Sequence, residues 1–136
     1  MAVRLKTGSY WYPLGSEKLL HSFFSTIAFH LEENDWGSKY PLIMNELYQG
    51  ELENNIDHAL YELDDIRFNL KKYTSDQIVW DINDMSREPP WGKHIKKNKT
   101  DLSNSFISIY GENLFDIFQN AFYKAKEIEE TIKMIK

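Results

Sequence analysis

The chain has 136 residues, with 16 Lys and Arg against 21 Asp and Glu, and a formal net charge of −5. It contains no cysteine, which excludes disulfide bonds, thiol nucleophiles and cysteine-ligated zinc. This length and acidic balance predict a single domain over residues 1–136 and argue against a nucleic-acid partner.

The first 31 residues predict β structure followed by a helix. Residues 2–13 alternate apolar and charged side chains and then become aromatic, with Gly8–Ser9 between the halves. They predict one strand or a hairpin of two, closed by Pro13 and Gly15. Ser16 stands in an N-cap position, so a helix of about 15 residues should follow. Its apolar stripe consists of Leu20, Phe24, Ile27 and Leu31.

Two further helices are expected in the first half of the chain. Glu32–Tyr40 is rich in turn residues and predicts a loop. Pro41 suits the first turn of a short helix that Gly50 ends. Asn54 or Asn55 begins a longer helix that runs to about Tyr73, with acidic residues turned mostly to water. The stripe of that helix is Ile56, Ala59, Leu60, Leu63, Ile66 or Arg67, and Leu70.

The second half predicts two strands and a terminal helix. Thr74–Gln77 has the spacing of a capping box, but the β-branched and aromatic residues Ile78–Ile82 favour a strand, so the box is interpreted as a chance match. Asn83–Asn98 contains prolines and most of a basic run that reaches Lys99, and predicts a long, solvated loop. Ser103–Tyr110 predicts another strand, and a last helix runs from about Asn113 to Lys133.

The resulting order is β–α–α–α–β–β–α, which is not the regular alternation of a doubly wound sheet. It predicts the α+β class, with a small, mostly antiparallel sheet on which about four helices pack. No apolar run approaches the roughly 20 residues needed to cross a bilayer, and the N-terminal segment lacks the apolar core of a signal peptide. We therefore expect a cytoplasmic protein that does not act in a membrane.

The strongest functional signal is an acidic stretch. Between residues 19 and 66 there are ten acidic residues and one basic residue, Lys39. Such a field attracts basic partners and speeds their association. Trp36 and Tyr48 are candidate anchors for a partner, because interfaces favour these rings. The candidate binding carboxylates are Glu46, Glu51, Glu53, Asp57, Glu62, Asp64 and Asp65.

Little in the sequence predicts catalysis, and no cofactor is expected. The glycines and serines form no nucleotide-binding loop and no nucleophile elbow. His58 and Glu62 are four residues apart on a predicted helix, a spacing that could hold a metal if further ligands joined them. A small metal-dependent enzyme is therefore one alternative, and a homo-oligomeric scaffold built on the aromatic residues is another.

Several blocks of aromatic, glycine and proline residues resemble a known family. They are Gly8–Tyr12, Leu20–Ile27, Trp36–Leu42, Asn45–Gly50, Val79–Ile82, Pro89–Gly92 and Leu114–Ile117. Over nearly the whole chain the sequence resembles the immunity protein 70 family of bacterial polymorphic toxin systems. The resemblance implies a cytoplasmic, non-enzymatic protein that binds a cognate toxin domain and blocks its active site or an essential exosite. The acidic stretch implies that this toxin domain is basic. The resemblance supplies no catalytic residue and no contact motif.

Overall fold

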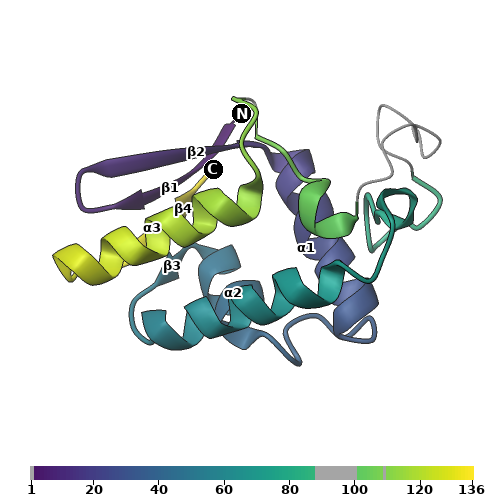
Figure 1. Ribbon diagram of the computed structural model, residues 1–136, viewed down its shortest axis with the longest axis horizontal. Helices are drawn as coiled ribbons and strands as arrows, with labels where there is room; N and C mark the ends of the chain where they lie inside the picture. The colour runs from purple at the N-terminus through teal and green to yellow at the C-terminus, as the bar shows by residue number, and fades with distance from the viewer. Residues whose placement is uncertain (1, 88–100, 109) are drawn as a thin grey trace.

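A computed structural model of the chain describes residues 2–87, 101–108 and 110–136 (Figure 1). The predicted loop 83–98 lies outside the described residues from residue 88 onward, and so does most of its basic run. The regular elements are β1 (Ala2–Thr7), β2 (Tyr10–Ser16), α1 (Glu17–Leu31), the π-helix η1 (Leu42–Leu47), β3 (Glu51–Leu52), α2 (Ile56–Leu70), the 3-10 turns η2 (Ser75–Gln77) and η3 (Leu102–Asn104), α3 (Leu114–Ile128) and β4 (Ile132–Ile135). The predicted α+β class is confirmed, with helices against an antiparallel sheet.

The sheet has the strand order β2-β1-β4-β3, and every neighbouring pair is antiparallel. β1 and β2 form the predicted hairpin, and Gly8 takes a left-handed φ of 59° in its tight turn. Pro13 and Gly15 lie within β2 and do not close it. Val3 and Leu5 point into the core, whereas Arg4 and Lys6 lie on the other face of the sheet, over the ring of Trp11.

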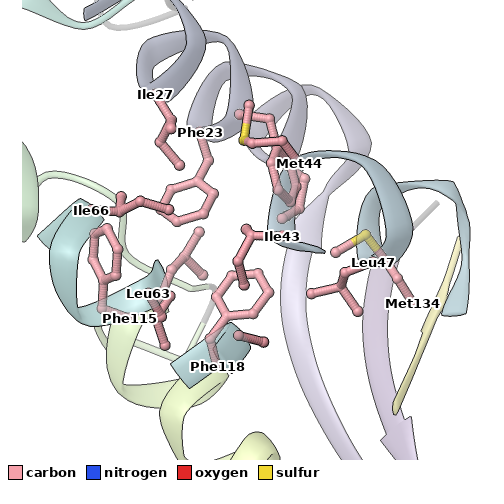
Figure 2. Packing of buried hydrophobic residues seen from close by; sticks show 14 of the residues in the cluster. Phe23, Ile27, Ile43, Met44, Leu47, Leu63, Ile66, Phe115, Phe118 and Met134 are labelled. Atoms are coloured by element: carbon pink, nitrogen blue, oxygen red, sulfur yellow. The ribbon is translucent and has the colours of Figure 1, made fainter. Parts of the chain in front are cut away.

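The helices and the inner face of the sheet share one hydrophobic core. Phe23 of α1 lies at its centre, with its ring stacked on Phe118 of α3 and in edge contact with Phe115 and Phe106. Figure 2 shows Ile43 of η1 and side chains of α2 converging on the same cluster. This aromatic core fixes the relative positions of α1, α2 and α3, and so of the surfaces that they expose.

The predicted strand Ile78–Ile82 is wrong, because this segment pairs with a helix and not with another strand. Val79 donates its N–H to Thr26 Oγ1 (2.9 Å), and its carbonyl accepts from the hydroxyl groups of Ser22 (2.8 Å) and Thr26 (3.1 Å). Ile82 donates its N–H to Ser25 Oγ (3.2 Å). Side chains of α1 thus satisfy backbone groups that a sheet would otherwise pair. We call residues 78–82 the docked segment.

The turn before the docked segment also differs from the prediction. The capping box at Thr74–Gln77 is genuine: both of its hydrogen bonds form, and it begins the single turn η2. The turn η2 ends at Gln77, so a capping box can be followed directly by an extended segment. The box was therefore wrongly interpreted as a chance match.

The second predicted strand, Ser103–Tyr110, is also wrong. Residues 102–104 form η3, and Phe106 turns into the core. The chain then folds back, with Ile107 forming a bridge to Asn113, while Ile109 lies outside the described residues. High β propensity did not produce a strand here, because tertiary packing, with Phe106 fixed in the core, overrides the local preference.

The last helix is shorter than predicted and is followed by a strand. α3 ends at Ile128, where Glu129 takes a left-handed φ of 56°. Ile132 and Lys133, assigned to the helix from sequence, instead begin β4. Ile128 and Ile132 are four residues apart, a spacing that also fits one face of a helix. For this reason the start of β4 was predicted as a continuation of α3. β3 was missed because it has only two residues.

Candidate functional site

The predicted binding carboxylates divide into an internal group and an exposed group. Glu62 belongs to the first group and is only 4% exposed. Its two carboxylate oxygens accept the backbone N–H groups of Leu42 (3.4 Å) and Ile43 (3.0 Å), at the start of η1. Burial raises the pKa of Glu62, opposed by these two hydrogen bonds. The expectation that α2 acids mostly face water fails at this residue, because η1 needs an acceptor at its first turn.

Asp65 also has an internal partner. Its Oδ2 accepts the phenol hydrogen of Tyr40 at 2.6 Å, and Asp65 itself is half-buried. Burial of the phenol, followed by the hydrogen bond to this carboxylate, raises the pKa of Tyr40 far above its ordinary value. Asp65 thus holds the loop before η1 against α2, and its side chain is already engaged.

The other predicted carboxylates are accessible to different degrees. Glu46, Glu53, Asp57 and Asp64 are exposed, whereas Glu51 on β3 is half-buried. The structure brings only Glu53 and Asp57 together, since both line one open cleft of about 740 Å³. Glu46, Glu51 and Asp64 do not line it.

Residues from the start of α2 and from the end of α3, about 70 residues apart in the sequence, line this cleft. Figure 1 shows these two helix ends on the same side of the molecule. Glu129 and Glu130 also line it, so four carboxylates face the opening together with one lysine, Lys126. Lys126 Nζ pairs with Asp57 Oδ1 at 2.6 Å across the cleft. We call this site the acidic cleft. The sequence does not predict that Glu129 and Glu130 lie near the acidic stretch, because the fold brings these distant segments together.

Exposed aromatic rings lie beside the acidic cleft, on the outer face of α2. Tyr61 lines the cleft and is 69% exposed, and Phe68 is 63% exposed. With Asp57 and Asp64 they have spacings of four, three and four residues, so all four lie on one face of the helix. We call these residues the α2 stripe. The spacing of these residues in the sequence could have identified the stripe, but the apolar stripe on the opposite side of α2 is the more prominent pattern.

The two predicted aromatic anchors lie elsewhere and are half-buried. Trp36 donates its indole N–H to the Met44 carbonyl at 2.8 Å, and Tyr48 packs edge-on against Phe24 with ring centroids 4.8 Å apart. The rings of Trp36 and Tyr48 also contact each other, with centroids 5.1 Å apart. These contacts give both rings a role in fixing the loop 32–40 and η1 on α1.

The structure gives the metal hypothesis no support at His58 and Glu62. His58 is exposed, while both Glu62 oxygens face backbone N–H groups. Within residues 2–87, 101–108 and 110–136, no group of three or more His, Asp or Glu side chains is arranged to hold a metal ion.

A second pocket was not foreseen from the sequence. It has a volume of about 300 Å³ and is formed by the first turn of α1, Tyr48, the docked segment, Arg87 and the ends of β1 and β4. His21 Nε2 lies 3.0 Å from Asp81 Oδ1, and Arg87 Nη1 lies 3.6 Å from Asp81 Oδ2. We call it the α1 pocket. His21 and Asp81 are 60 residues apart, and nothing local to either residue predicts their meeting.

Comparisons with known proteins identify the family. No curated protein and no solved structure matches the chain. In the part of the chain that the structure describes, no helix is long and apolar enough to cross a membrane. The sequence model of the immunity protein 70 family matches residues 5–134, which include every regular element except the ends of β1 and β4. The chain therefore belongs to the immunity protein 70 family.

Proposed function

We propose that this protein neutralises a bacterial toxin in the cytoplasm by binding the toxin domain directly and non-covalently, without catalysis of its own. Membership of the immunity protein 70 family supports this class of function. The observation that carries the proposed interface is the acidic cleft, with its exposed aromatic neighbours on α2.

The charge of the acidic cleft favours a basic partner. Among the described residues, four carboxylates and one lysine line the opening, and that lysine is already paired with Asp57. A cleft lined by one sign of charge focuses its field outward, so it raises the association rate of an oppositely charged protein. We therefore infer that a basic segment of the toxin domain enters the acidic cleft.

The α2 stripe supplies the apolar part of the interface. Tyr61 and Phe68 are large rings that the protein's own core leaves uncovered, and they are two helical turns apart. Buried aromatic side chains at the centre of an interface commonly contribute 2 kcal/mol or more, whereas rim charges mostly change the association rate. We assign the anchoring role to Tyr61 and Phe68 in place of Trp36 and Tyr48, whose rings are engaged within the fold.

The first test identifies the toxin. Tagged protein is purified from its native cells, and a domain that copurifies at near-equal stoichiometry is expressed in a host, alone and with the immunity protein. The proposal predicts that the domain alone arrests growth and that coexpression restores it. Restored growth without a direct complex between the two purified proteins would contradict binding as the mechanism.

The second test locates the interface on the purified complex. The double variant Glu53→Gln and Glu130→Gln should lower the association rate about tenfold at low salt and flatten its salt dependence. Tyr61→Ala should weaken the equilibrium affinity about 30-fold, corresponding to about 2 kcal/mol. The matched control is Glu112→Gln, an exposed acid just before the opposite end of α3. If the control and the cleft variants behaved alike, the acidic cleft would not be the binding site.

A further inference from the structure

The α1 pocket is separate from the proposed toxin-binding surface. It shares no lining residue with the acidic cleft, and its charge has the opposite character. Lys18, Arg87 and Lys136 line it, together with two acids, Glu17 and Asp81. These three cations exceed the two acids by one charge, and Arg87 also pairs with Asp81 Oδ2 at 3.6 Å.

One of the two acids in the α1 pocket is already neutralised. Asp81 Oδ1 lies 3.0 Å from His21 Nε2 and accepts the backbone N–H of Asn83 at 2.9 Å, while Oδ2 faces Arg87. The hydrogen bond with His21, followed by that with Asn83, holds the pKa of Asp81 below its ordinary value, so this carboxylate stays ionised and paired. Glu17 is the other acid that lines the α1 pocket.

His21 is oriented by its neighbours. With Nε2 donating to Asp81 Oδ1, the Nδ1 atom of a neutral imidazole is an acceptor, and it lies 3.5 Å from the Tyr48 hydroxyl. The ring also stacks on Trp36, with centroids 6.2 Å apart. Tyr48, His21 and Asp81 thus form a fixed polar wall, and Lys136 Nζ lies 4.5 Å from the centroid of the Tyr48 ring.

The rest of the α1 pocket is apolar. Val3, Leu20 and Met134 line it and are buried, and Trp80 adds an indole ring that is 8% exposed. A pocket with one apolar side and a few convergent polar groups is the usual form of a small-molecule site, and its volume of about 300 Å³ is at the small end of that class.

We propose that the α1 pocket binds a small organic anion in which one carboxylate or phosphate group is attached to a flat apolar body. The anionic group lies among Lys18, Arg87 and Lys136, and the apolar body lies against Trp80, Leu20 and Met134. The first turn of α1 also lines the pocket, so the positive end of its dipole adds to the field of the cations. Carboxylate and phosphate ligands share this chemistry, and the experiment separates them.

The test uses benzoate and phenyl phosphate as probes, with neutral benzamide and inorganic phosphate as the comparison ligands. Each ligand is titrated into the full chain while the indole N–H resonances of the tryptophans are followed by NMR. At least one of the two aryl anions should bind saturably with a Kd below about 10 mM and shift the Trp80 resonance. Whichever anion binds with the lower Kd shows whether the site prefers a carboxylate or a phosphate group. Benzamide, which lacks the charge, and inorganic phosphate, which lacks the ring, should each bind at least tenfold more weakly.

Two substitutions then test whether the ligand binds in the α1 pocket. Lys18 is exposed, and no ion pair holds it in the part of the chain that the structure describes, so Lys18→Gln should fold normally and weaken the tighter probe about tenfold. Lys72→Gln, at an exposed lysine outside the pocket, should leave the affinity unchanged. No saturable binding of either aryl anion, equal binding of benzamide, or equal effects of the two substitutions would each overturn the proposal.

Discussion

Replacing Glu62 by alanine should destabilise the fold far more than replacing any exposed acid of α2. The substitution removes the acceptor for the N–H groups of Leu42 and Ile43, at the buried first turn of η1. A buried donor left without a partner costs about 1–3 kcal/mol. The longer of the two bonds is weak, and the loss of a desolvated carboxylate returns part of the cost. We therefore expect a loss of about 3 kcal/mol in the free energy of unfolding.

Urea denaturation and thermal unfolding both measure this loss. In a chain of this size about 3 kcal/mol corresponds to a decrease of about 10 °C in Tm. The matched control is Asp64→Ala, two residues further along α2, where the carboxylate is exposed and has only a long contact of 3.5 Å with Gln119. That variant should change stability by less than about 0.5 kcal/mol. Equal effects of the two substitutions would refute the assignment of Glu62 as the acceptor that begins η1.

The pH dependence provides a second check on the same residue. Burial raises the pKa of Glu62 above its ordinary value of 4.5, so the folded state retains the proton after the unfolded state has lost it. The stability that this proton contributes is full below pH 4.5 and is lost as the pH rises through the folded-state pKa. Glu62→Gln cannot ionise, so its stability should change less over that interval than that of the wild type. A Gln variant with the wild-type pH profile would contradict the raised pKa.

Three further substitutions test individual hydrogen-bonding groups elsewhere in the fold. Thr26→Val keeps the side-chain shape but leaves the Val79 N–H without its acceptor, so the free energy of unfolding in urea should fall by about 1–2 kcal/mol. Thr7→Val should raise Tm, because the Thr7 hydroxyl is buried with no hydrogen-bond partner among the described residues, and its removal relieves up to about 1 kcal/mol. Asn113→Ala should lower the stability by about 1 kcal/mol in the same urea assay, because Asn113 Oδ1 caps α3 by accepting from the Phe115 N–H at 2.9 Å.

Local signals predicted the helices well and the sheet poorly. Ser16 caps α1 through a hydrogen bond from the Leu19 N–H, and α1 has the predicted length of 15 residues. Caps and apolar periodicity depend on residues within a few positions of one another, so the sequence displays them directly. Strand pairing depends on which segment the fold brings alongside. For this reason Ile78–Ile82 was predicted as a strand, although α1 supplies its hydrogen-bond partners.

The candidate site shows the same division. The acidic stretch was visible as composition, but its composition could not show that Glu62 turns inward to η1 while Asp57 faces solvent. Nor could it show that Glu129 and Glu130, which follow α3, share a cleft with Glu53. Family membership could be predicted from the sequence, because the aromatic, glycine and proline residues that carry the resemblance are spread along nearly the whole chain.

The attachment of the docked segment to α1 makes one backbone amide a specific reporter. In helices and strands, protection of an amide from hydrogen exchange measures the opening of that element. The Val79 N–H belongs to neither, and its acceptor is the Thr26 hydroxyl, so its exchange reports the detachment of the docked segment from the helix. Asp81 would leave His21 in the same event, and the wall of the α1 pocket would open while the core around Phe23 stayed closed. Deuterium uptake at this single amide therefore measures how often the pocket loses that wall.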